Sequence, residues 1–475
     1  MREPETIDRI EPSARQVFAR QKFACLNQPQ IPYGERIDLL NTIESILIEN
    51  DEAICDAIST DFGNRSLHET RILEISSSLM GLRDARKRLK KWMSPRRRHV
   101  SMVFFGGKNR VIPQAKGVVG VVTPWNYPLF LAVSPMTCAI AAGNRVMVKQ
   151  AANSQNLCRL LAQKFSEKIS REKIAFLPGV GGDEFSSLPY DHLIFTGSPG
   201  VGKNIMAGAS KNLTPVTLEL GGKSPTILAD DYDVKTAVER IMYAKLINSG
   251  QTCIAPDYLF VPQAKVDEVV AMAKTVVAKR YPDIQTRNYT NIIDEKAYSR
   301  LKATLEDARS KKAGIINLLP GPGVDDTLRK ISPTLLTSVT PDMRIMQEEI
   351  FGPLLPILPY TSTDQVIEYI NVHERPLALY LFSNDSALQD RFIENTMSGG
   401  VTINDCAMHV AQHDLPFGGV GNSGMGQYHG YEGFLEFSKL RPVFKQARYT
   451  LALTPPYGST INRIYAAIKR FKWLS

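Results

Sequence analysis

Residues 117–150 read GVVGVVTPWNYPLFLAVSPMTCAIAAGNRVMVKQ, and this stretch decides the fold class. It begins with a nearly continuous apolar strand (117–123), passes through a turn into a helix over residues 128–142, and ends in a second apolar strand (144–150). Such apolar runs are typical of parallel strands that helices cover on both faces. Prolines interrupt the uncharged run over 117–144, so we do not expect it to span a membrane.

The alternation of strand and helix continues along the chain. Two further apolar strands are expected at 175–179 and 191–197, and a second series begins near residue 215 with a long helix over 233–249. Residues 12–95 show the three- and four-residue apolar spacing of helices. The sequence therefore predicts an α/β protein with a Rossmann-like nucleotide-binding domain and a second α/β unit.

The charge distribution raises the question of an acidic partner. The chain has 475 residues, which predicts two or three domains, and a net charge of +9. Residues 83–98 hold nine Lys or Arg against one Asp. A nucleic-acid or anionic-membrane patch is one interpretation, but only Trp92 offers an aromatic platform there. The solvated face of a helix is favoured, and we expect no nucleic-acid partner.

Cysteine usage indicates the compartment. The six cysteines are scattered and form no CxxC pair, so the sequence predicts neither a metal site nor a disulfide framework. A reducing cytoplasm fits this pattern best. The first ten residues, MREPETIDRI, contain no apolar stretch of the kind found in secretory signals.

The C-terminal residues 461–475, INRIYAAIKRFKWLS, are basic and amphipathic at helical spacing. Such a segment could lie on a membrane surface. A terminal helix that packs on the protein or frays is the favoured interpretation.

A glycine-rich turn follows the strand at 191–197. Residues 195–204 read FTGSPGVGKN, which resembles a Walker A loop except that Asn204 stands where Mg²⁺ needs a Ser or Thr hydroxyl. A turn that opens a helix still presents backbone N–H groups to phosphate. A dinucleotide site therefore competes with a nucleotide hydrolase, and the missing hydroxyl argues against the hydrolase.

Three stretches contain residues that could take part in a chemical reaction. Asn126 in TPWNYP (123–128) could donate to an oxyanion, although an Asx-turn is the simpler role. Glu219 lies in an apolar strand, where it could be a general base with a raised pKa or could pair with Lys223. Cys253 in NSGQTCIAPD (248–257) lies in a turn whose backbone N–H groups would favour a thiolate, although an isolated Cys is more often apolar filler.

Taken together, these stretches resemble the NAD(P)-dependent aldehyde dehydrogenases. Six motifs occur in the family's order over roughly residues 10–445: TPWNYP, FTGSPGVGK, LELGGKSP, SGQTC, EEIFGP and LPFGGVGNSGMG. The short N-terminal extension and VTINDCAMHV resemble the class 3 branch, and HVAQHDLPFGGVGNSGMGQYHGYEGF resembles the bacterial coniferyl-aldehyde dehydrogenases.

The resemblance implies catalytic roles. Cys253 would attack the aldehyde carbon, while Asn126 and the backbone N–H of Cys253 would hold the oxyanion. Glu219 would then activate the water that hydrolyses the thioester. These residues supply the nucleophile, the donor and the base that the individual motifs suggested.

The resemblance also implies a cofactor site for NAD or NADP. The residues assigned to it are Trp125, Lys149, Gly197, Ser198, Gly202, Glu349 and Phe351. Many family members have a Glu three positions after the lysine, where it accepts from the ribose 2′-OH and repels a 2′-phosphate. Ala152 stands there in this chain, so we expect NADP to be accepted alongside NAD.

Aromatic and methionine side chains near the family's substrate tunnel suit an apolar aldehyde. Tyr127, Met408 and Phe417 are the expected pocket residues. An aromatic aldehyde such as coniferyl aldehyde is favoured, and a medium- or long-chain aliphatic aldehyde is the alternative. No metal site is expected.

The resemblance further implies a homodimer and a domain division. The expected ranges are 1–96 with 116–221 for the NAD(P)-binding domain and its N-terminal helices, 222–422 for the catalytic domain, 97–115 with 438–447 for a bridging arm, and 448–475 for the C-terminal tail.

Overall fold

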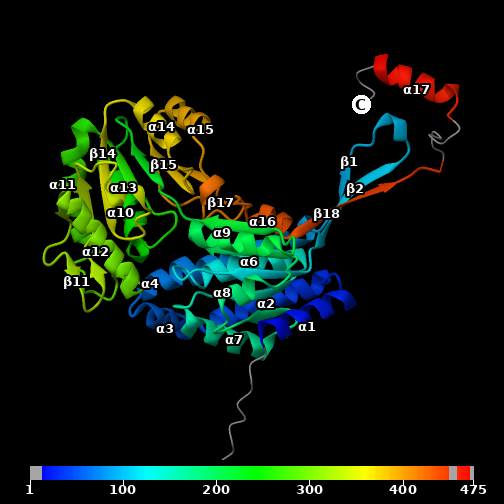
Figure 1. The fold of residues 1–475 in the computed structure, drawn as a ribbon, viewed down its shortest axis with the longest axis horizontal. Coiled ribbons are helices and arrows are strands. Elements are labelled where there is room, and N and C mark those ends of the chain that lie inside the picture. The colour runs from blue at the N-terminus through cyan, green and yellow to red at the C-terminus, as the bar shows by residue number, and fades with distance from the viewer. Residues whose placement is uncertain (1–12, 449–456, 471–475) are drawn as a thin grey trace, which may run out of the picture.

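A computed structural model describes residues 13–448 and 457–470, apart from the Val103 side chain. Figure 1 shows two lobes of helices and strands, with a slender arm of strands projecting from one of them. The predicted α/β class with two sheet-based units is confirmed.

The first lobe is built around a six-stranded sheet in the order β17-β7-β6-β3-β4-β5. Its strands are β3 (Val118–Val122), β4 (Arg145–Lys149), β5 (Ile174–Phe176), β6 (His192–Gly197), β7 (Val216–Leu220) and β17 (Gly424–Met425). The first five run parallel, and β17 pairs antiparallel with β7. Parallel strands place their carboxyl ends, where ligands bind in such sheets, on one edge.

Helices cover both faces of this sheet. They are α1 (Ala14–Asn27), α2 (Tyr33–Glu49), α3 (Asp51–Phe62), α4 (Leu67–Glu69), the π-helical turn η1 (Thr70–Ser76), α5 (Ser77–Trp92), α6 (Phe130–Ala142), α7 (Gln155–Lys168), α8 (Gly182–Ser186), α9 (Pro199–Ser210) and α16 (Gly430–Glu436). Helix α6 is buried along almost its whole length and ends at Gly143, whose φ of +94° suits a residue without a side chain.

The second lobe contains a seven-stranded sheet in the order β10-β13-β14-β9-β8-β15-β16. Its strands are β8 (Pro225–Leu228), β9 (Tyr258–Pro262), β10 (Gly314–Asn317), β13 (Thr334–Thr337), β14 (Leu354–Tyr360), β15 (Ala378–Phe382) and β16 (Gly400–Ile403). Only β10 runs antiparallel to its neighbour in this sheet. A separate short pair joins β11 (Val324–Asp325) to β12 (Lys330–Ile331).

The helices of this lobe pack around its sheet. They are α10 (Val234–Leu246), α11 (Val266–Arg280), α12 (Glu295–Ser310), α13 (Arg344–Gln347), α14 (Thr363–Val372) and α15 (Ser386–Asn395), with 3-10 turns η3 (Ile247–Gly250), η4 (Gln263–Lys265) and η5 (Gly421–Ser423). The helix predicted over 233–249 is shorter than expected. It ends at Leu246 because Asn248 and Ser249 both have φ of +52°, which a right-handed helix does not allow.

The projecting arm consists of β1 (Arg96–Arg98), β2 (Lys108–Ala115) and β18 (Ser438–Lys445), with the 3-10 turn η2 (Met102–Phe104) at its tip. All three strands are antiparallel, and β2 lies between the other two. Most of its surface is exposed; Phe105, for example, is 86% exposed.

The basic segment over 83–98 divides between α5 and the arm. On α5, Arg83 contacts the Glu44 carboxylate at 2.6 Å and Arg88 contacts Asp84 at 2.9 Å. These ion pairs support the interpretation of α5 as a solvated helix face.

The C-terminal prediction falls partly outside the described residues. Residues 449–456 and 471–475 are not described, and α17 (Ser459–Arg470) has no buried residue. No helix among residues 13–448 and 457–470 is long and apolar enough to cross a bilayer.

Candidate active site

Two cavities meet at the carboxyl edge of the six-stranded sheet. The first, which we term the apolar chamber, has a volume of about 1000 Å³, and the second, the polar cavity, about 1300 Å³. Four residues line both of them: Thr196, Glu219, Leu220 and Cys253. A thiol and a carboxyl group therefore lie where an apolar molecule and a polar one can approach from different sides.

A strained turn presents Cys253. The turn η3 precedes it, and its residues Asn248 and Ser249 adopt left-handed conformations that cost energy for residues with side chains. The next residue, Gly250, has a φ of +75° and approaches the chain so closely that a Cβ would lie 2.3 Å from the carbonyl oxygen of Gly352. The turn thus needs both a glycine and surrounding contacts to hold it.

The surroundings of the Cys253 thiol raise its pKa. Burial, followed by the charges of Glu349 and Glu219, raises its pKa to about 12. The backbone N–H groups of Cys253 and Ile254 favour the thiolate, as the sequence suggested, but their effect is smaller than that of burial. A positively charged group in the polar cavity would stabilise the thiolate and so lower the pKa of Cys253.

Glu219 lies in β7 and is buried, with no hydrogen-bond partner for either carboxylate oxygen among the described residues. Burial and the charge of Glu436 raise its pKa well above the ordinary value. The alternative pairing with Lys223 is not formed, because Lys223 instead contacts Asp257 and donates to the carbonyl of Ile345 at 2.8 Å. Glu219 therefore has the features of a proton-transfer group.

Asn126 lies in the turn that follows β3 and lines the polar cavity. Its Oδ1 atom is buried and has no hydrogen-bond partner among the described residues. Its main-chain carbonyl accepts from Arg65 Nη1 at 2.9 Å and from Asn248 Nδ2 at 3.0 Å. Two hydrogen bonds therefore hold the main chain at Asn126, and one of them comes from the strained turn before Cys253.

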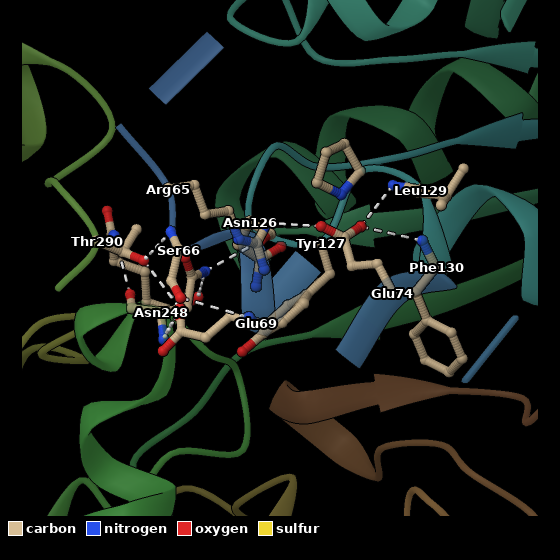
Figure 2. Close-up of polar contacts among 12 residues, drawn as sticks. Arg65, Ser66, Glu69, Glu74, Asn126, Tyr127, Leu129, Phe130, Asn248 and Thr290 are labelled. Atoms are coloured by element: carbon tan, nitrogen blue, oxygen red, sulfur yellow. Dashed lines mark hydrogen bonds and ion pairs between the residues drawn. The ribbon is translucent and has the colours of Figure 1, made fainter. Parts of the chain in front are cut away.

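A buried ionic network supports these contacts (Figure 2). Arg65 Nη1 contacts Glu74 Oε1 at 2.6 Å, and both side chains are fully buried. The other carboxylate oxygen of Glu74 accepts from the backbone N–H of Leu129 at 2.7 Å and of Phe130 at 3.1 Å. One carboxylate therefore joins Arg65 to both residues that open helix α6 after the Asn126 turn.

A second carboxylate holds the other side of the site. Glu69 Oε2 accepts from the backbone N–H of Asn248 at 3.1 Å and from the Thr290 hydroxyl at 2.8 Å (Figure 2). Burial raises the pKa of Glu69, and the nearby Arg65 lowers it. The strained residue Asn248 is thus anchored to the same network that holds Asn126.

The sequence analysis missed this network. Glu74 lies in RILEI (71–75), where a carboxylate stands among apolar residues of a helical segment. The same argument that singled out Glu219 applies here, because a carboxylate in apolar surroundings needs a partner or a function. Arg65 carried no such signal, since an isolated Arg between two helices is usually exposed.

The polar cavity collects most of the predicted cofactor residues. Trp125, Gly197, Ser198, Glu349 and Phe351 all line it. The ring of Phe351 meets that of Trp125 edge-on at 5.4 Å. The structure thus brings together five residues from three separate stretches of sequence.

Two predicted cofactor residues lie elsewhere. Lys149 ends β4, and Gly202 lies within α9; neither is among the lining residues. At Gly202 a Cβ would lie 2.7 Å from Leu220 Cδ2, so this glycine lets α9 approach β7. Its role in the fold is close packing of helix on strand.

The walls of the polar cavity have features that suit a dinucleotide. Ser198 precedes α9, whose first N–H groups receive no side-chain cap. Free N–H groups at a helix start attract phosphate. At Gly221 a Cβ would lie 2.2 Å from Glu349 Oε2, so the chain leaves that carboxylate space at the cavity wall. Burial and the nearby Asp257 raise the pKa of Glu349 to about 8.

The predicted pocket residues line the apolar chamber. Tyr127, Met408 and Phe417 are all in its wall, together with Cys253 and Glu219. The Tyr127 hydroxyl and the Thr252 hydroxyl lie 2.8 Å apart, next to the turn that presents Cys253. The chamber is otherwise lined mainly by apolar side chains, so it suits an apolar molecule that presents a polar group to Cys253.

No group of three or more His, Cys, Asp or Glu side chains suited to a metal ion occurs among residues 13–448 and 457–470. All six cysteines are free.

Comparison with known proteins gives a consistent result. The sequence model described as "Aldehyde dehydrogenase family" matches residues 4–443. A probable coniferyl aldehyde dehydrogenase from Pseudomonas aeruginosa is 47% identical over 453 residues, covering 94% of each chain.

Two solved structures have the same fold. The substrate-bound Staphylococcus aureus AldH has a TM-score of 0.90 and 36% identity, and the match covers 96% of this chain and 100% of that one. An aldehyde dehydrogenase from Mycobacterium tuberculosis complexed with NAD+ has a TM-score of 0.82 and 28% identity, covering 92% of each.

Proposed function

The chain belongs to the aldehyde dehydrogenase family, and from this premise we propose that Cys253, Glu219 and Asn126 oxidise an aromatic aldehyde to its carboxylic acid. The family uses NAD(P)+ as the oxidant. The observation that supports the residue assignment best is that Cys253 and Glu219 line both the apolar chamber and the polar cavity.

Cys253 acts as the nucleophile. In its thiolate form, Cys253 attacks the aldehyde carbon: the sulfur lone pair forms the C–S bond, and the carbonyl π electron pair moves to the oxygen, which becomes an oxyanion. The Asn126 side-chain amide and the backbone N–H of Cys253 stabilise this charge, and a donor placed in advance lowers the barrier more than one that must reorganise. The contacts from Arg65 and Asn248 to the Asn126 carbonyl keep the amide in place.

NAD(P)+ supplies the hydride acceptor when it is bound. Transfer of hydride from the thiohemiacetal carbon to that acceptor would re-form the carbonyl and leave an acyl group on the Cys253 sulfur. The residues of the polar cavity fit this cofactor: the start of α9 suits the diphosphate, Glu349 has free space at Gly221, and Phe351 and Trp125 form an aromatic wall.

Glu219 acts in the second half of the reaction. As a base it removes a proton from water, the water oxygen attacks the thioester carbon, and the C–S bond breaks to release the acid and the Cys253 thiolate. The unpartnered oxygens of Glu219 leave it able to bind that water. Its raised pKa makes the ionised carboxylate a strong base.

The apolar chamber supports an aromatic substrate over an aliphatic one. Phe417 lies 6.0 Å from the His409 ring and is stacked on it, and His409 lies 6.3 Å from Tyr380. The Tyr380 hydroxyl donates to the carbonyl of Ile254, next to Cys253. These rings form a series that begins beside Cys253 and reaches the apolar chamber only at Phe417. Phe417 lines the chamber together with Phe130 and Tyr428, so a planar substrate can pack on an aromatic wall there.

The test is oxidation of coniferyl aldehyde, benzaldehyde and decanal, followed by the appearance of NADH or NADPH. We expect turnover of both aromatic aldehydes to exceed that of decanal and to vanish in Cys253→Ala. A faster reaction with decanal would favour the aliphatic alternative. Turnover that survives in Cys253→Ala would refute the assignment of the nucleophile.

We also propose a homodimer that assembles through the arm of 97–115 and 438–447. The support is the exposed tip, where the Phe104 and Phe444 rings meet 5.6 Å apart and remain 41% and 48% exposed. Sedimentation velocity would test this: Phe105→Asp should shift the dimer toward monomer, and an unchanged sedimentation coefficient would refute it.

The domain ranges 1–96 with 116–221 and 222–422 remain our proposal, with β17 and α16 returning to the first lobe. A cytoplasmic location is proposed from the six free cysteines, which a reducing compartment keeps reduced. Fractionation of cells that express the protein would test the location.

A further inference from the structure

Three histidines beside the apolar chamber have ring nitrogens that the reaction does not use. The Nε2 atoms of His409 and His413 and both ring nitrogens of His429 are buried and have no hydrogen-bond partner among the described residues. His409 is tied by its other nitrogen, which lies 2.8 Å from the Thr402 hydroxyl. Buried polar atoms are normally paired, so these nitrogens point to a missing ligand or water.

His413 and His429 line a small side pocket next to the chamber. Its wall also contains the hydroxyl residues Ser78, Ser134 and Thr137. Three residues line both the side pocket and the apolar chamber: Ser77, Phe130 and His413. The side pocket is therefore a polar extension of an otherwise apolar chamber, and His413 stands at the junction.

Aromatic contacts fix the direction of the His409 and His429 imidazoles. His429 is stacked on Phe417 at 5.4 Å, on the same ring that stacks on His409. It also meets Phe130 at 5.9 Å and is 5% exposed. The ring series that begins near Cys253 thus ends at a histidine whose nitrogens face no protein partner.

We propose that His413, supported by His429, binds the phenolic hydroxyl of a ring-hydroxylated aromatic aldehyde whose carbonyl lies at Cys253. This inference rests on the proposed function and adds the recognised substituent. It makes His413 a specificity-determining residue and leaves the bond-making steps unchanged.

The proposed contact is a hydrogen bond between two uncharged groups, the phenol and an imidazole. A phenol O–H donates, and the unprotonated nitrogen of a neutral imidazole accepts. Burial, with the nearby His413 and His409, lowers the pKa of His429 to about 3, so that ring is neutral at physiological pH. A substrate without the hydroxyl leaves the His413 nitrogen unpaired, and an unpaired buried group costs binding energy.

The experiment compares 4-hydroxycinnamaldehyde with cinnamaldehyde, which differ only in the hydroxyl. The measured quantity is the ratio of their kcat/KM values in wild type and in His413→Leu. The intrinsic effect of the hydroxyl on the carbonyl is the same for both proteins and cancels between them. We expect the ratio to fall about fivefold to tenfold in His413→Leu, through the hydroxylated substrate alone.

Two matched variants sharpen the result. His413→Gln keeps a hydrogen-bonding side chain and should restore part of the ratio. His373→Leu removes an exposed imidazole just after the end of α14 and should leave the ratio unchanged. An unchanged ratio in His413→Leu, or an equal loss with both substrates, would overturn the proposal.

A measurement on wild type guards against a variant that does not fold. The product 4-hydroxycinnamate should bind more tightly than cinnamate by calorimetry, and equal affinities would overturn the inference. Failure of the underlying function looks different: wild type would then oxidise neither aldehyde, whereas failure of the inference alone leaves cinnamaldehyde turnover intact.

Discussion

Replacing Glu74 by Gln should separate the positioning of Asn126 from the chemistry itself. Among the described residues, Glu74 accepts from Arg65 and from the backbone N–H groups of Leu129 and Phe130, and not from Cys253, Glu219 or Asn126. Gln has nearly the same shape and keeps one acceptor oxygen, but it removes the charge. The buried Arg65 guanidinium, which donates to the Asn126 carbonyl, then loses its closest counter-charge.

The structure gives the size of the effect. Removing one partner of a buried ion pair costs about 3–5 kcal/mol of stability. Glu69 also acts on Arg65 and offsets part of this loss, so we expect a value near the lower end. For activity, a shift of about 1 Å in a catalytic group costs about a hundredfold. We therefore expect kcat to fall about tenfold to a hundredfold, without a change in the affinity for NAD.

The assay pairs urea denaturation with steady-state kinetics at saturating cofactor. Glu306→Gln is the matched control, because its ion pair with Arg309 is more than half exposed on both sides and should contribute less than about 1 kcal/mol. Arg65→Lys should retain more activity than Glu74→Gln, since it keeps the charge. A Glu74→Gln protein that loses stability but keeps wild-type kcat would refute the positioning role.

Three further outcomes are expected. With Ala152 exposed after β4, the preference for NAD over NADP in kcat/KM should stay below about 10³-fold (~4 kcal/mol), and Ala152→Glu should raise it; a larger preference in wild type would contradict the reasoning. Glu219→Gln removes a negative charge that raises the pKa of Cys253, so iodoacetamide should alkylate Cys253 at lower pH than in wild type. The alkylation rate should still rise with pH, and a pH profile that does not shift would count against this coupling. Gly202→Ala should lower the thermal midpoint, because its Cβ would lie 2.7 Å from Leu220 Cδ2. Gly208→Ala in the same helix meets only Ser186 Oγ, at an ordinary 3.9 Å, and should leave or raise the midpoint; equal effects would show that close packing does not decide the outcome.

The fold was predictable because two features of the sequence identify its strands: their apolar composition and their regular alternation with helices. Continuous apolar runs such as 117–123 can only be buried on both faces, and their alternation with helices requires parallel pairing. The end of α10 was not predictable in the same way. Residues 247–249 carry no glycine or proline that would mark the end of the helix, and contacts with residues distant in sequence, such as Glu69 and Asn126, hold Asn248 in a left-handed conformation.

Parts of the candidate site were predictable where a single residue is unusual in its local sequence. Glu219 is a carboxylate in an apolar strand, and Cys253 lies in a glycine-containing turn, so local sequence singled out both. The raised pKa of Cys253 was not visible, because it arises from burial and from Glu349 and Glu219, which are distant in sequence. The His413 side pocket was hidden for the same reason: its walls come from α5, α6 and the loop before α16.

The pairing of β2 with β18 has a consequence for biosynthesis. In this pair Gln114 lies beside Lys439, and Arg441 contacts Gln114 across 327 residues of sequence. A ribosome that adds about 5–20 residues per second therefore releases β2 tens of seconds before its neighbour exists. During that interval one edge of β2 lacks a strand, and the charges of Lys108 and Arg110 help keep the nascent chain from aggregating. The sheet of the arm is therefore complete only once β18 has been synthesised.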